Sequence, residues 1–210
     1  MKRIILVIAI VFAASLRAQA PEPMPLAHGN IPGEPHHHLK IENEYVRVYY
    51  VEVPAHENTF LHQHDHDYLF VTLGDSDVIN AVRDKPEVHL VLKDGETHFT
   101  RGGFAHVARN LADTPFRNIT IELLHPQTGA HNVCGPVMGL GFATCDPVIS
   151  SYGGVDEFET AEFTLSHEWL SAGAKHHEKA TKLALLIVGL DGAKIKIKQK
   201  GKPPEILHDE

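Results

Sequence analysis

The chain has 210 residues, of which 43% are hydrophobic and 22% are charged, and its formal net charge is −8 at pH 7. This length and composition are typical of a globular protein with a sizeable core. The negative charge argues against nucleic acid or an anionic membrane surface as a partner, because both bind positively charged faces.

Residues 1–20 predict an export signal. Lys2 and Arg3 precede an apolar run at 4–14, and the small-residue pattern Ala18-Gln19-Ala20 follows. A run of this length is too short to span a bilayer, which takes about 20 residues, and the order of features is that of a cleavable signal peptide. Cleavage after Ala20 removes three of the 19 basic residues and none of the 27 acidic ones, which leaves a formal charge of −11. We expect a periplasmic or extracellular protein that does not bind membranes once the signal is removed.

Residues 21–40 form a segment rich in proline and histidine, which predicts an extended N-terminal arm. Its three consecutive histidines, 36–38, are interpreted as surface residues rather than metal ligands.

Residues 41–126 carry short runs rich in Val, Ile, Tyr and Phe, with turn residues between them. The clearest runs are 45–53, 68–74, 88–95 and 116–124. Short, regular strands without intervening helices indicate an antiparallel sandwich or barrel.

Residues 127–156 read as a glycine-rich linker that contains the two cysteines of the chain, Cys134 and Cys145. In an exported protein the two can form a disulfide, which would add about 3 kcal/mol in the chain-entropy model. The alternative is two free, buried thiols.

Residues 157–210 resume the strand pattern. With a shift of 117, residues 170–192 align with 53–75 in apolar positions and turns, which suggests a repeated unit. Lys179 and Thr181 stand where the first copy has two histidines. We therefore expect a degenerate, incomplete second unit that covers a sheet surface or edge.

The stretch FLHQHDHDYLF, residues 60–70, is the strongest candidate for a functional site. Alternate side chains of a strand share a face, so His62 and His64 would project together with Cβ atoms about 7 Å apart. A third metal ligand must come from another strand, and His106, just after the Gly102-Gly103 turn, offers one.

These residues resemble the two motifs of the cupin superfamily. The second motif, G(X)5PXG(X)2H(X)3N, is matched at Gly95, Gly103, His106 and Asn110, with Arg101 in the proline position.

The first motif, G(X)5HXH(X)3,4E(X)6G, is matched at His62, His64 and Gly74, while His56 occupies the position of its leading glycine. Its carboxylate position is open between two neighbours. Asp67 has the right distance to Gly74, and Tyr68 has the right distance from His64.

The resemblance implies an all-β jelly-roll barrel (a double-stranded β-helix) whose residues His62, His64 and His106 hold one divalent metal. It implies Asp67 or Tyr68 as the fourth ligand or as a group that moves a proton. Neutral imidazole suits Fe, Zn, Mn, Ni or Cu, and three protein ligands leave a position for a small molecule.

Two functions follow from this resemblance. The first is an exported small-molecule enzyme of dioxygenase-like or isomerase-like type. The second is a non-catalytic module that binds or stores a small ligand, which the degenerate second unit and the unsettled carboxylate favour. Cupin barrels commonly pair through exposed sheet edges, so a homodimer is also expected.

Overall fold

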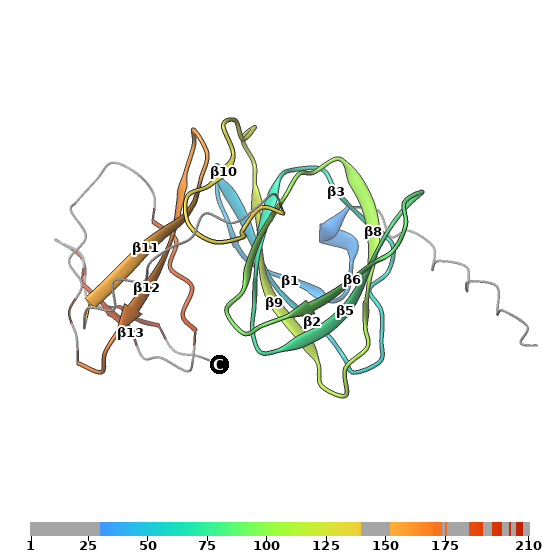
Figure 1. Cartoon of the computed structure of the whole chain (residues 1–210), viewed down its shortest axis with the longest axis horizontal. Coiled ribbons are helices and arrows are strands. Elements are labelled where there is room, and N and C mark those ends of the chain that lie inside the picture. The colour runs from blue at the N-terminus through green and yellow to red at the C-terminus, as the bar shows by residue number, and fades with distance from the viewer. Residues whose placement is uncertain are drawn as a thin grey trace, which may run out of the picture.

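The computed structural model describes residues 30–139, 152–173, 175, 185–190, 195–198, 202 and 205–207. The predicted export signal and Cys145 lie outside these residues. Apart from one 3-10 turn, Ile31–Gly33, the regular structure of the described residues consists of β-strands (Figure 1). No helix among the described residues is long and apolar enough to cross a membrane.

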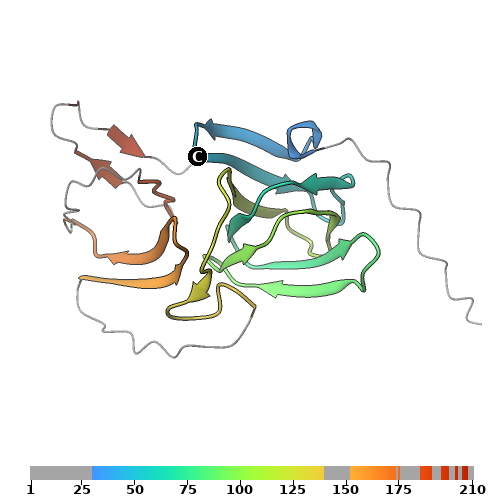
Figure 2. The same cartoon turned by 90° about the horizontal axis from the view of Figure 1, so that it is seen from above.

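Two antiparallel sheets form a barrel (Figures 1 and 2). The first sheet has the order β1 (His37–Glu42), β2 (Val46–Val53), β9 (Phe116–Leu123), β4 (Tyr68–Thr72), β7 (Thr97–Thr100). The second sheet has the order β3 (His62–His64), β8 (Phe104–Asn110), β5 (Ser76–Val82), β6 (Val88–Leu92). Because sequence neighbours such as β3 and β4 lie in different sheets, the topology is the predicted jelly roll.

The barrel is filled by alternate side chains of its strands. Strand β2 shows this alternation. Tyr49, Val51 and Val53 point inward and are buried, whereas Tyr50 and Glu52 between them are only partly buried. The interior cluster comprises Ile31, Tyr49, Val51, Val53, Val78, Leu92, Ala108 and Phe116.

The motif glycines close turns that other residues adopt with strain. Gly74, Gly95 and Gly103 have φ values of +88°, +72° and +86°, a region that L-residues with a side chain rarely occupy. His56, which replaces the leading glycine of the first motif, also has a positive φ of 61°. The family motif therefore marks the backbone conformation here, and this chain adopts it with a non-glycine residue.

Asn110 holds the end of β8 through its side chain. Its amide nitrogen donates to the carbonyls of Val53, Pro54 and Thr114, and its amide oxygen accepts from Ala112 N. The last residue of the second motif is thus an anchor of the barrel.

The barrel begins inside the predicted N-terminal arm. Ile31 is 1% exposed and belongs to the interior cluster, and β1 starts at His37 and pairs with β2. Hydrogen bonding to β2 orders this segment, because β1 adds an edge strand to an existing sheet.

The C-terminal strands lie beside the barrel (Figure 2). They form a three-stranded sheet and a hairpin, namely β10 (His131–Asn132), β11 (Tyr152–Glu159), β12 (Thr164–Leu170), β13 (Ile195–Ile197) and β14 (Glu205–Leu207). Phe158 is fully buried against Val48, Leu69 and Phe99 on the outer face of the five-stranded sheet. The prediction that this part covers a sheet surface is confirmed.

The internal repeat stays a prediction. Residues 185–190, which the shift of 117 aligns with β4, carry no strand, and much of 171–204 lies outside the described residues. The boundaries of the five segments predicted from the sequence likewise stay predictions. Cys134 is disulfide-bonded.

Candidate metal centre

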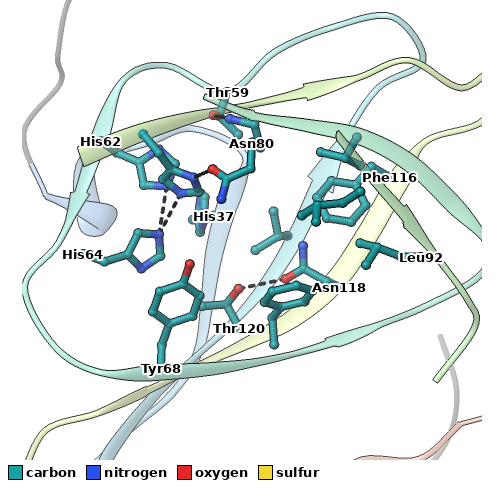
Figure 3. A pocket seen from close by; sticks show the side chains of 16 residues that line it. His37, Thr59, His62, His64, Tyr68, Asn80, Leu92, Phe116, Asn118 and Thr120 are labelled. Carbon is teal, nitrogen blue, oxygen red and sulfur yellow. Dashed lines mark hydrogen bonds between the residues drawn. The ribbon is translucent and has the colours of Figure 1, made fainter. Parts of the chain in front are cut away.

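Three of the predicted ligands meet inside the barrel. His62 and His64 come from β3, and His106 comes from the neighbouring strand β8, where it lies directly opposite His62. Their exposed fractions are 1%, 1% and 8%. Figure 3 shows the rings of His62 and His64 turned toward one another over the cavity.

The three Nε2 atoms form a nearly equilateral triangle. The distances are 3.2 Å between His62 and His64, 3.0 Å between His64 and His106, and 3.1 Å between His106 and His62. Two nitrogens bound at right angles to one metal, each at about 2.1 Å, lie about 3.0 Å apart. The triangle therefore has the dimensions of one face of a metal coordination sphere.

Hydrogen bonds at the opposite ring edges fix two of the imidazole tautomers. His62 Nδ1 donates to the Phe60 carbonyl at 2.9 Å, and His106 Nδ1 donates to Asn80 Oδ1 at 2.7 Å. In these neutral rings both Nε2 atoms carry lone pairs, which face each other at 3.1 Å. Two such lone pairs repel unless a proton from His64 or a cation lies between them, so the residues fit a metal.

The ring of His64 can adopt the tautomer that suits either the metal-free or the metal-bound site. His64 Nδ1 is buried and has no hydrogen-bond partner within the part of the chain that the structure describes. No acceptor therefore fixes the tautomer of His64, and its Nε2 can carry a proton without metal or a lone pair toward metal.

Burial keeps the three rings neutral. It lowers the pKa of His62 to about 4, with a smaller contribution from repulsion by His37. Burial and the neighbouring histidines hold the pKa values of His64 and His106 well below the usual value of 6.5. Neutral imidazole is the form that binds metals, so protons compete weakly for the site near pH 7.

A fourth histidine reaches the cluster from β1. One ring nitrogen each of His37, His62 and His64 lie within 4.8 Å of one another, and the side chain of His37 is 5% exposed. The expectation that residues 36–38 lie on the surface holds for the exposed His38 but is wrong for His37. No motif spacing points to His37, because it approaches the cluster through pairing of β1 with β2.

Tyr68 lines the cavity, as one of the two predicted alternatives requires. Its ring stacks on His64 with centroids 4.1 Å apart, and its hydroxyl points into the cavity (Figure 3). Burial raises the pKa of Tyr68 far above its usual value. The phenol is therefore protonated and can donate a hydrogen bond.

Asp67 faces a different set of partners. Its Oδ2 accepts from Arg101 Nη1 at 2.6 Å, and its Oδ1 accepts from Gly102 N at 2.9 Å. Asp67 does not line the cavity. Its observed contacts tie β4 to the turn that precedes β8, and its predicted roles as fourth ligand or proton-transfer group have no support from these contacts.

The cavity beside the histidines is small, and the described residues that line it include no Lys, Arg, Asp or Glu. Its volume is about 60 Å³, enough for a few water molecules or a similarly small ligand. Phe70, Leu90 and Phe116 supply apolar walls. Asn118 Oδ1 accepts from Thr120 Oγ1 at 2.8 Å, and the amide nitrogen of Asn118 points into the cavity (Figure 3).

The class of protein follows from these observations. A jelly-roll barrel whose HXH strand lies beside a strand with a third histidine, in the order of the two motifs, is the fold and the histidine arrangement of the cupin superfamily. This assignment depends on the barrel and on the motif residues.

Comparisons with known proteins relate about two fifths of the chain to solved structures. No protein-family model and no curated protein matches the sequence. Among solved structures, 41% of the chain is similar to 90% of a cupin domain from Bordetella pertussis Tohama I, with 26% identity and a TM-score of 0.40. An RmlC-like cupin family protein with a double-stranded β-helix fold from Methanocaldococcus jannaschii is similar at 12% identity over 43% of this chain and 80% of its own, with a TM-score of 0.38.

A third similar structure carries a named activity. It is the DMSP lyase DddQ from Ruegeria pomeroyi DSS-3, with 23% identity and a TM-score of 0.32. The likeness covers 39% of this chain and 39% of the lyase.

Proposed function

We propose that the protein is an exported, metal-dependent cupin enzyme that acts on a small molecule by dioxygenase-like or isomerase-like chemistry. The convergence of three Nε2 atoms at 3.0–3.2 Å on a buried cavity carries this proposal. Asn80 and the Phe60 carbonyl orient two of the rings, as expected for hydrogen bonds that support metal ligands. A bound divalent metal would supply Lewis-acid or redox activation of an oxygen-bearing substrate.

The cavity lining supports a small, oxygen-bearing substrate. A volume of about 60 Å³ admits a molecule of a few heavy atoms. The amide nitrogen of Asn118 and the hydroxyl of Tyr68 can donate hydrogen bonds to acceptor oxygens, and Phe70 and Phe116 add apolar surface to the lining. These groups favour a small oxygen-rich molecule that is neutral or has an anionic oxygen for the metal.

Export is supported by two features of the chain. The first is the signal pattern at residues 1–20. The second is the disulfide bond of Cys134, because structural disulfides persist mainly in oxidising compartments. The proposal includes a small molecule as the partner and a homodimer as the assembly.

The second candidate function is a non-catalytic module that binds or stores a small ligand. The observation in its favour is that the cavity lining, as far as the chain is described, offers no carboxylate or lysine to act as a general base. The two candidates differ in whether a bound ligand is changed.

Elemental analysis and product detection test the two candidates together. Protein purified without added metal should hold about one metal per chain, and His106→Ala should lose it because one corner of the Nε2 triangle is removed. His131→Ala serves as control, since this ring is exposed at the surface. Unchanged metal content in His106→Ala, or no metal in the wild type, contradicts the metal site.

Mass spectrometry after incubation with small oxygen-bearing compounds should show a new product that His106→Ala does not form, and ligand retention without a product supports the binding module.

A further inference from the structure

His37 forms a second triad with two of the motif histidines. Its ring centroid is 4.7 Å from that of His62 and 6.4 Å from that of His64. One ring nitrogen from each of the three residues lies within 4.8 Å of the other two. The triads His62–His64–His106 and His37–His62–His64 therefore share two rings and the same cavity (Figure 3).

Glu34 determines which nitrogen of His37 faces the cluster. Its Oε2 accepts from His37 Nδ1 at 2.6 Å, and its Oε1 accepts from His36 Nδ1 at 2.8 Å and from Phe60 N at 3.1 Å. The Glu34 side chain is fully buried. Because Nδ1 of His37 is held by the carboxylate, Nε2 carries the lone pair that can bind a metal, the usual arrangement of a carboxylate behind a ligating histidine.

The segment that carries His37 is anchored beside β3. Ile31 is buried in the barrel core, Asn30 forms a bridge with Gln63, and the Asn30 amide donates to Asp65 Oδ2 at 2.6 Å. On its other side, His37 pairs with Val51 of β2. These contacts hold His37 in place before any metal arrives.

The cupin resemblance implied a carboxylate ligand that the observed contacts do not provide. Asp67 is bonded to Arg101 and Gly102, and Tyr68 offers a neutral phenol. We propose that His37, positioned by Glu34, is the fourth protein ligand of the metal. This proposal rests on the proposed metal site and specifies its ligand set as four imidazoles, with the carboxylate of Glu34 placed behind one of them.

Counting imidazoles around a bound probe metal tests the ligand set directly. The full mature chain is loaded with Cu²⁺, and pulsed electron paramagnetic resonance measures how many imidazoles bind the copper. We expect four in the wild type and three in His37→Ala. His38→Ala is the matched control, because the neighbouring ring is exposed, and it should retain four.

Zinc affinity supplies a second, independent measurement. Competition with a chelating dye should show a Kd for Zn²⁺ that is about 10 to 100 times higher in His37→Ala. Glu34→Gln should raise this Kd about tenfold, because the amide orients His37 less strongly. The Kd of His38→Ala should equal that of the wild type. His37→Gln, with a side chain of similar reach, replaces His37→Ala if the alanine variant does not fold.

The outcomes separate this proposal from the proposed function. If His37→Ala or His37→Gln keeps the wild-type imidazole count and Kd while His106→Ala loses the metal, His37 is not a ligand and the three-histidine site stands. If the wild type binds neither Cu²⁺ nor Zn²⁺, the proposed function itself is wrong.

Discussion

Glu122 is a buried carboxyl group that the proposed chemistry does not use. Its side chain is 4% exposed, Arg47 Nη1 lies 3.8 Å from Oε2, and the Tyr49 hydroxyl donates to the same oxygen over a long distance of 3.5 Å. Burial raises the pKa of Glu122, and the charges of His66 and Arg47 only partly offset this effect. A carboxyl whose pKa is raised by folding favours the folded state when it is protonated and loses that contribution as the pH rises through its folded pKa.

Replacing Glu122 with glutamine should therefore stabilise the metal-free protein near pH 7. Glutamine keeps the shape and the acceptor oxygen but removes the buried charge, so we expect a gain of about 1 kcal/mol in the free energy of unfolding. The gain should shrink below pH 4.5, where the carboxyl is protonated in both states. Urea unfolding of both proteins at pH 7 and pH 4 measures the difference. A variant that is less stable than the wild type at pH 7 would show that Arg47 and Tyr49 stabilise the ionised carboxylate.

At the scale of elements, the turn between β7 and β8 determines where His106 lies. Gly102 packs so closely on the loop between β3 and β4 that a Cβ atom there would lie 2.4 Å from the backbone carbon and oxygen of His66. Its amide also donates to Asp67 Oδ1. A side chain could rotate away from an added Cβ, but these backbone atoms cannot. A larger residue at position 102 must therefore displace the turn.

Gly102→Ala should lower the free energy of unfolding by about 1–3 kcal/mol, the usual cost of an overpacked site. It should also weaken Zn²⁺ binding, because the turn leads into the strand that carries His106. Gly139→Ala is the control, since a Cβ there meets no atom of the described residues within 4 Å. Denaturant unfolding and the zinc titration check both effects, and equal behaviour of the two variants would contradict this role for the turn.

At the scale of the whole molecule, the C-terminal sheet stabilises the barrel from outside. Phe158 is 0% exposed, and its ring lies 4.7 Å from Phe99 and 5.8 Å from Phe163. These residues occupy the outer face of the five-stranded sheet. His62, His64 and His106, by contrast, line the cavity inside the barrel.

Phe158→Ala should cost about 3–5 kcal/mol of unfolding free energy and leave the Kd for Zn²⁺ unchanged under conditions where the protein is folded. Trp169→Ala, on the neighbouring strand, should change stability little because Trp169 is 52% exposed. Thermal melts compared with the zinc titration test this separation. Loss of zinc binding in folded Phe158→Ala would show that the C-terminal sheet positions the metal site.

Local patterns in the sequence determined the strand character of the barrel and three of the cluster histidines. Alternation with period two places His62 and His64 on one face, and the turn glycines mark backbone positions with positive φ. These features act over a few residues, so they can be recognised in the sequence alone. The structure confirms the fold and brings His62, His64 and His106 together, while their metal binding and the export of the chain stay proposals.

Only the tertiary structure decided which other groups surround the histidines. His37 reaches His62 because β1 pairs with β2 and Glu34 bonds to Phe60 N, a contact across 26 residues. Asp67 turns toward Arg101, 34 residues away, and not toward the cavity. In an antiparallel barrel, the neighbours of a side chain are set by pairing between distant strands, and the composition of a single strand carries no record of that pairing.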